Sequence, residues 1–186
     1  MDLYGELLLE HSKRPLHAGL RDGADAEVHH VNPTCGDEVT LRVHLERAAS
    51  AGDGDGESVS EPVGLVLRDL SYDALGCSIS IAATSMLAEE SVGRPVIETL
   101  ATYDQVHAML TSKGQDLGDV EQIGDAVALA GVAKYPARVK CALLGWSAYL
   151  DALARAGVDI AASRHEIPAT RREIVEPLDQ PGRLPR

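Results

Sequence analysis

The segment Asn32–Asp37, with the sequence NPTCGD, is excluded from any helix. Pro33 lacks a backbone N–H and Gly36 permits a sharp bend, so we expect a turn here. Side chains two residues apart in extended backbone point to the same face, which directs Cys35 and Asp37 at a common point. A thiol and a carboxylate so placed indicate a metal site or an activated thiol. The alternative is a buried cysteine beside a turn-forming aspartate.

Three segments around this turn are expected to form strands. Residues 28–31 fit a short strand before it, and residues 63–75 fit a less regular strand with Leu65, Leu67 and Asp69 on one face. Between them, residues 47–62 are rich in Gly, Ser and Asp and are expected to form an exposed hairpin connection. Strict alternation over residues 38–45 places four hydrophobic side chains on one face of a strand: Val39, Leu41, Val43 and Leu45.

Hydrophobic residues at helical spacing predict helices over residues 3–14, 78–90, 98–110 and 136–157. Pro136 suits the first helical position and Gly157 suits a C-terminal cap. Glycines interrupt residues 113–133, which are expected to be an excursion between helices. Residues from 158 onward carry four prolines and few hydrophobic side chains, so we expect an extended or disordered extension.

Composition limits the classes of function. A chain of 186 residues with 45% hydrophobic residues is expected to fold as one domain. Its 29 acidic and 17 basic residues give a net charge of −12, which argues against a nucleic-acid or anionic-membrane binder. We expect no secretory signal, because the first residues carry no basic segment and no small-residue cleavage site, and no hydrophobic run is long enough to cross a bilayer. Three cysteines, an odd number at wide spacing, argue against a disulfide framework, so a cytoplasmic location is expected.

The three cysteines all occupy positions that favour a thiolate. Cys35 lies in the turn, Cys77 at a strand-to-helix junction and Cys141 in the first turns of the last long helix, and helix N-termini stabilise thiolates. Arg138, three residues before Cys141, shares its helical face and can offset its charge, although a solvated surface cation is the simpler interpretation. The cysteine spacing matches no short zinc-finger pattern, so three unrelated buried thiols remain an alternative.

Three thiolates and one carboxylate form a donor set that favours a soft metal. Such a set suits zinc or an iron–sulfur cluster rather than magnesium or calcium. The histidines show no comparable pattern: His29 and His30 alternate across a strand, so at most one of them can face Cys35. The glycine- and aspartate-rich residues 52–56 resemble a calcium loop in composition only.

Four segments together resemble the NifU-N/IscU family of iron–sulfur assembly proteins. The resemblance spans roughly residues 3–157, which we treat as one domain of this type, with residues 158–186 as an extension. It implies an α+β fold in which helices pack on one side of a three-stranded antiparallel sheet and the metal site lies at one end. The four segments are LYGELLLEH (3–11), NPTCGD (32–37), GCSIS (76–80) and YPARVKCA (135–142).

Within that family, Lys140 before the third cysteine and the insert around residues 113–133 are similar to the SufU branch. That branch implies a zinc-dependent sulfurtransferase, or sulfur acceptor, whose metal ligands would be Cys35, Asp37, Cys77 and Cys141. Cys35 would accept persulfide sulfur from a SufS-type cysteine desulfurase, with Arg138 as a supporting catalytic residue and a SufBCD-type scaffold complex as a further candidate partner. Two alternatives stay open: a scaffold that holds iron or a transient 2Fe-2S cluster on the same ligands, and a purely structural zinc module.

Overall fold

The computed structural model describes residues 3–47 and 64–165, which form a three-stranded antiparallel sheet packed against helices, as predicted. The strands are β1 (Ala26–Asn32), β2 (Asp37–Arg47) and β3 (Leu65–Leu75), in the spatial order β1-β2-β3. The predicted hydrophobic face of β2 is present: Val39, Leu41 and Val43 are buried, and Leu45 is partly buried against the core. Most of the expected hairpin connection falls on residues 48–63, outside the described part of the chain.

A change of register between β2 and β3 alters which residues of β3 face the core. His44 pairs with Asp69 and the next residue, Leu45, pairs with Leu67, so Arg68 is an extra residue on β3. Such a bulge reverses the alternation beyond it. The prediction for β3 is therefore wrong at one position: Leu70, not Asp69, joins Leu65 and Leu67 in the core.

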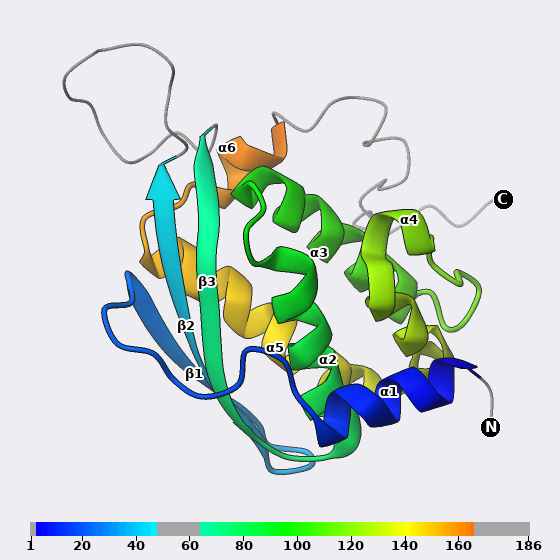
Figure 1. Ribbon diagram of the computed structural model, residues 1–186. Coiled ribbons are helices and arrows are strands. Elements are labelled where there is room, and N and C mark those ends of the chain that lie inside the picture. The colour runs from blue at the N-terminus through cyan, green and yellow to red at the C-terminus, as the bar shows by residue number, and fades with distance from the viewer. Residues whose placement is uncertain (1–2, 48–63, 166–186) are drawn as a thin grey trace, which may run out of the picture.

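Two long helices cover one face of the sheet. Helix α5 (Pro136–Arg155) packs on β1 and β2, and α2 (Ser78–Ser91) packs on β3 and on α5. Figure 1 shows the helices gathered on this side, with α1 (Leu3–Lys13) crossing α2 and α3 (Val96–Thr111) lying beyond it. The largest fully buried side chains come from β3 and α5: Tyr72, Trp146 and Tyr149.

The four predicted helices are present, and further helices occur in two regions where none was predicted: residues 113–133 and the residues after 158. The excursion over residues 113–133 contains the short helix α4 (Val120–Ile123) and the 3₁₀ helix η1 (Gly124–Lys134), which buries a run of alanine, valine and leucine side chains. The expectation of an extended or disordered extension is wrong for Ile160–His165, which form α6 against α3. Asp159 begins α6 by accepting hydrogen bonds from the amides of Ala162 and Ser163.

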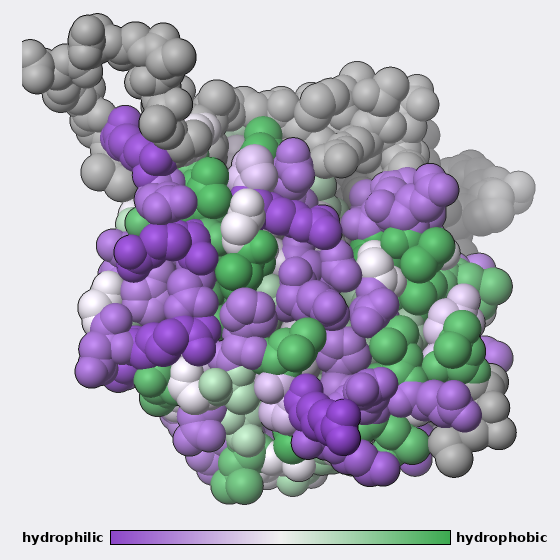
Figure 2. Space-filling model, in the orientation of Figure 1, coloured by the Kyte–Doolittle hydropathy of each residue, from purple (hydrophilic) through white to green (hydrophobic). Residues whose placement is uncertain are grey.

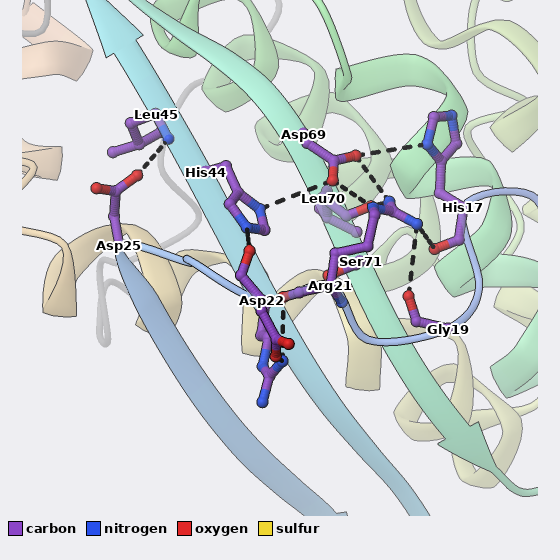
Figure 3. A network of polar contacts seen from close by, with 11 residues as sticks. His17, Gly19, Arg21, Asp22, Asp25, His44, Leu45, Asp69, Leu70 and Ser71 are labelled. Carbon is purple, nitrogen blue, oxygen red and sulfur yellow. Dashed lines mark hydrogen bonds and ion pairs between the residues drawn. The ribbon is translucent and has the colours of Figure 1, made fainter.

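The loop before β1 covers the outer edge of β3. Ala18 forms a parallel bridge with Tyr72, and the Gly19 amide donates to the Tyr72 carbonyl at 2.8 Å. Figure 3 shows Arg21 of this loop bound to the carboxylate of Asp69, with a further hydrogen bond of 2.8 Å to the carbonyl of Leu70. These contacts protect an edge strand that would otherwise leave backbone groups unpaired.

The surface of the sheet seen in Figure 2 is predominantly hydrophilic over β1–β3. Among residues 3–47 and 64–165, no helix has the length and hydrophobicity needed to cross a membrane.

Candidate metal centre

The turn between β1 and β2 presents Cys35 at the surface. The Asn32 carbonyl accepts hydrogen bonds from the amides of Gly36 at 2.8 Å and Cys35 at 3.3 Å. The Asn32 side-chain oxygen accepts a third bond, from the Thr34 amide at 3.1 Å. Gly36 has a φ of +75°, which glycine adopts without the steric cost of a side chain. The tight turn therefore leaves the Cys35 side chain exposed at its tip.

Asp37, the first residue of β2, is only 3% exposed and joins the turn to the start of α2. Its Oδ1 accepts a hydrogen bond of 3.0 Å from the Cys77 amide, and its Oδ2 lies 3.4 Å from the Cys77 Sγ. Gly76 makes this approach possible, because a Cβ there would lie 2.7 Å from the Asp37 carboxyl group.

Cys77 is the N-cap residue of α2, which agrees with the predicted strand-to-helix junction. Its backbone is extended, with φ −73° and ψ 162°, and its carbonyl accepts the first helical hydrogen bond, from the Ile81 amide at 3.1 Å. The Cys77 side chain is exposed and sits beside the positive end of the helix dipole.

Cys141 lies in the second turn of α5, which begins at Pro136, and its side chain is buried. Its Sγ is 3.2 Å from the Cys35 Sγ. The packing of α5 on β1 and β2 brings these two thiols together from positions 106 residues apart.

The structure thus gathers all four predicted ligand residues at one end of the sheet. Ligand atoms of Cys35, Asp37 and Cys141 all lie within 4.8 Å of one another, and Cys77 joins this group through Asp37. Sulfur atoms bound to one tetrahedral zinc ion lie about 3.8 Å apart, so the three nearest groups need only small movements to bind one. The donor set fits zinc, while the assignment of these residues as metal ligands stays a prediction.

The electrostatics of the cluster also suit a cation. Burial raises the pKa of Asp37, but hydrogen bonds from the thiols of Cys35 and Cys141 and from the Cys77 amide and thiol outweigh it, so the pKa lies below its usual value. Burial, together with hydrogen bonds to Cys35 and Asp37, raises the pKa of Cys141 well above that of an ordinary thiol. The charged Asp37 carboxylate therefore disfavours the Cys141 thiolate, and a bound divalent cation would reverse this preference.

Arg138, the residue predicted to assist, and Lys140 are exposed side chains in the first turns of α5. The Arg138 guanidinium stacks over the exposed Tyr135 ring, 5.0 Å from its centroid, in the first turn of α5. His30 is turned to the helix side and lies 3.0 Å from the carboxylate of Asp151, whereas His29 bonds to Thr40 across the sheet. Neither histidine belongs to the thiol cluster.

Sequence reasoning assigned no role to the Asn32 side chain, which the structure places against the cluster. Asn32 is 5% exposed, and its Nδ2 lies 3.7 Å from the Cys141 Sγ. The amide group therefore shapes the turn through its oxygen and contacts a thiol through its nitrogen. The Asn-Pro pair at the start of the turn is the only sequence signal for the first of these contacts.

Comparison with known proteins decides the family. The model of the "NifU-like N terminal domain" family matches residues 3–53 and 58–142. The chain belongs to this family.

Two relatives of this NifU-like domain differ in the function that their names state. The "iron-sulfur cluster assembly scaffold protein IscU" of Streptococcus pyogenes serotype M1 is 35% identical over 153 residues, covering 82% of this chain and 84% of the relative.

The second relative is the "zinc-dependent sulfurtransferase SufU" of Bacillus subtilis (strain 168), which is 33% identical over 154 residues, covering 82% of this chain and 90% of the relative. Among solved structures, the NifU-like domain resembles a candidate iron–sulfur cluster assembly scaffold protein of the SUF system from Fervidobacterium islandicum AW-1. The TM-score is 0.62 at 27% identity, with 80% of this chain and 94% of that one covered. A NifU-like protein from Brucella abortus, at 21% identity and TM-score 0.64, covers 83% of this chain and 94% of its own and shares the fold.

Proposed function

We propose that this NifU-like domain is a zinc-dependent sulfur acceptor in iron–sulfur cluster assembly. It would receive persulfide sulfur on Cys35 from a SufS-type cysteine desulfurase and pass that sulfur to a SufBCD-type scaffold complex. The observation that carries the proposal is the difference between the two closest thiols: Cys35 is exposed on a turn, while Cys141, 3.2 Å away, is buried. Only an exposed thiol can meet a group held by another protein.

The proposed zinc ligands are Cys35, Asp37, Cys77 and Cys141. When bound, zinc would supply a positive charge that keeps the cysteines as thiolates without redox chemistry of its own. Asp37, already charged and oriented by the Cys77 amide, would hold its carboxylate between the start of β2 and the start of α2. Arg138, one helical turn before Cys141, would add a cation at the rim that offsets the remaining negative charge.

The chemical step is a thiolate–persulfide exchange. The Cys35 thiolate attacks the terminal sulfur of the desulfurase persulfide, and a new sulfur–sulfur bond forms at Cys35 as the bond within the donor breaks. The donor cysteine leaves as a thiolate, so the exchange needs no external oxidant or reductant. The product is a persulfide on Cys35.

The test combines metal analysis with a sulfide-release assay on the same sample. Protein purified without chelators should contain about one zinc per chain and should stimulate a SufS-type desulfurase. Cys35→Ala should abolish the stimulation while remaining folded. Thr34→Ala is the matched control, because Thr34 lies in the same turn and uses its backbone amide for its hydrogen bond. Stimulation by Cys35→Ala equal to that of wild type would refute the role of Cys35.

The second candidate function is a scaffold for a transient 2Fe-2S cluster, which the name of the Streptococcus pyogenes relative favours. The same ligands serve both functions, so the test is spectroscopic. Anaerobic addition of iron and sulfide should leave a sulfur acceptor with bound zinc and without a stable visible chromophore. A cluster spectrum that is lost in Cys141→Ala would instead support the scaffold.

A further inference from the structure

A second group of metal-ligating side chains lies where α1, α2 and η1 meet. His11 comes from α1, Glu89 from α2 and Asp125 from the start of η1. The His11 Nε2 is 3.2 Å from the Asp125 Oδ2 and 3.5 Å from the Glu89 Oε2, and one ligand atom of each residue lies within 4.8 Å of the other two. Three elements that are far apart in sequence thus converge on one point.

The imidazole is held in a fixed orientation from its other side. His11 is 6% exposed, and its Nδ1 lies 2.8 Å from the Ser85 Oγ on α2. That hydroxyl oxygen also accepts the Leu16 amide at 2.8 Å, which leaves it one lone pair for a hydrogen on Nδ1. Metal-binding histidines are commonly oriented in this way, by a hydrogen bond from the ring nitrogen that does not touch the metal.

The Nε2 atom faces two carboxylates, and a single hydrogen on Nε2 would bond well to only one of them. Burial first, and then the charge of Asp125, raise the pKa of Glu89, while His11 lowers it. The position therefore concentrates negative charge beside a buried ring. Glu90 does not join the group, because its carboxylate accepts the Asp125 amide at 3.3 Å and pairs with Arg94 at 3.1 Å.

The separations of the three atoms suit a metal ion. Ligand atoms about 2.1 Å from one ion lie roughly 3.0 Å apart at octahedral angles and roughly 3.4 Å apart at tetrahedral ones. The two separations from Nε2, 3.2 and 3.5 Å, match these values without rearrangement of the helices. The carboxylates of Glu89 and Asp125 are each 41% exposed, so the group opens to solvent on one side and can admit an ion with its remaining water ligands.

We propose that His11, Glu89 and Asp125 form a second metal site, which binds a divalent transition-metal ion independently of the thiol cluster. One imidazole and two carboxylates favour Mn²⁺, Fe²⁺, Co²⁺ or Zn²⁺, whereas calcium and magnesium prefer oxygen ligands alone. Cys77 and Glu89 are twelve residues apart on α2, or about 18 Å along the helix, so no single ion can bridge the two groups. A bound ion would tie α1 and η1 to α2.

Manganese is the probe, because Mn²⁺ favours carboxylate and imidazole over thiolate ligands. The full chain is titrated with Mn²⁺, and binding is monitored as the loss of the electron paramagnetic resonance signal of the free ion. The titration should reveal one site. Paramagnetic broadening in the amide spectrum should be strongest around His11, Ser85, Glu89 and Asp125 and weaker at Cys35 and Cys141. This result is independent of the sulfur-acceptor proposal, because it involves no thiol and no desulfurase.

Two isosteric variants and one control locate the site. Glu89→Gln and Asp125→Asn should each weaken Mn²⁺ binding by at least about tenfold. Glu10→Gln, which removes the same charge from an exposed neighbour of His11, should change the affinity by no more than about twofold. Circular dichroism should show that all three variants are folded.

Two results would overturn the proposal. The first is that the wild-type chain does not bind millimolar Mn²⁺ and that Asp125→Asn is less stable to unfolding than wild type. The group would then be an ion pair between protonated His11 and Asp125. The second is Mn²⁺ binding that is unchanged in both variants or whose broadening centres on other residues.

Discussion

The carboxylate of Asp37 and the N-cap residue Cys77 are joined at two points. The Cys77 amide donates to Oδ1 at 3.0 Å, and the Cys77 thiol lies 3.4 Å from Oδ2. The side chain of a residue at the start of β2 therefore accepts a hydrogen bond from a backbone amide at the N-terminus of α2, forty positions away in the sequence, where amides have no partner within the helix. The same carboxylate that approaches the thiols thus also fixes the sheet against the helix that carries Cys77.

Gly76→Ala tests this junction directly. A Cβ at residue 76 would lie 2.7 Å from the Cγ and Oδ1 of Asp37, so the carboxylate has to move. We expect the free energy of unfolding to fall by about 1–3 kcal/mol, as for other overpacked sites. Zinc affinity, measured by competition with a chromogenic chelator, should fall as well, because the proposed ligand Asp37 is displaced.

Gly131→Ala is the matched control for that substitution. A Cβ at residue 131, on η1, would have no other heavy atom within 4 Å. Its effect on the free energy of unfolding should stay within about 0.5 kcal/mol, as for other surface positions. Equal losses of zinc affinity in the two alanine variants would show that the contact between Gly76 and Asp37 does not govern the cluster.

Asn32→Asp tests the side chain that sequence reasoning did not assign. The variant keeps an oxygen to accept the Thr34 amide, but it replaces the amide nitrogen 3.7 Å from the Cys141 Sγ with a negatively charged oxygen. Repulsion from this charge should disfavour the Cys141 thiolate and weaken zinc binding by about 10–100-fold, the range typical of groups that orient metal ligands. An unchanged affinity in the chelator competition would show that Asn32 serves the turn alone.

Local sequence patterns predicted the parts of the fold that local physics governs. Alternation located β2 and β3, and Pro136 and Gly157 marked the ends of α5, with Gly157 in the positive-φ conformation of a C-terminal cap. The turn with Cys35 and the junction with Cys77 were predicted for the same reason. Each depends on residues within a few positions of the feature itself.

The features that were missed depend on distant partners. The bulge at Arg68 is defined by the pairing of β3 with β2, and β3 alone shows it only as a less regular alternation. Helix η1 lacks a regular hydrophobic period, and the packing of Gly124 against the Glu90 side chain helps position it. The contact between Asn32 and Cys141 requires α5 to be docked on the sheet. Convergence of the four ligand residues was expected from family resemblance and not from their spacing.

Thr99 and Tyr149 form a buried hydrogen bond whose two partners should differ in importance. The Thr99 hydroxyl donates to the Val96 carbonyl at 2.8 Å, so the Tyr149 hydroxyl, 2.5 Å away, must be the donor in the bond between them. Tyr149→Phe removes one hydrogen bond and leaves Thr99 with a partner, which should cost about 1 kcal/mol. Thr99→Val leaves the buried Tyr149 hydroxyl unpaired and should cost about 1–3 kcal/mol. Denaturant unfolding of the two variants shows which substitution lowers the free energy of unfolding more. A larger decrease in Tyr149→Phe would contradict the assigned direction of the hydrogen bond.

The ion pair between Arg21 and Asp69 should make stability depend on acid pH. The hydrogen bond from Arg21 holds the pKa of Asp69 below its usual value of 3.8, against the opposing effect of burial, with further lowering by the charges of Arg21, His44 and His17. Figure 3 shows these groups around the carboxylate. A lowered pKa in the folded state contributes stability that is fully present above the pKa of the unfolded chain and is lost as the pH falls through the folded value.

Asp69→Asn isolates this contribution. The difference in free energy of unfolding between wild type and variant should be large at about pH 5 and above, and should shrink as the pH falls below about 4. Asp73→Asn is the control, since Asp73 is an exposed carboxylate on the same strand. Urea unfolding at pH 7, 5, 4 and 3 provides the measurement. A difference for Asp69→Asn that does not change over this range would show that the Arg21–Asp69 contact does not couple folding to protonation.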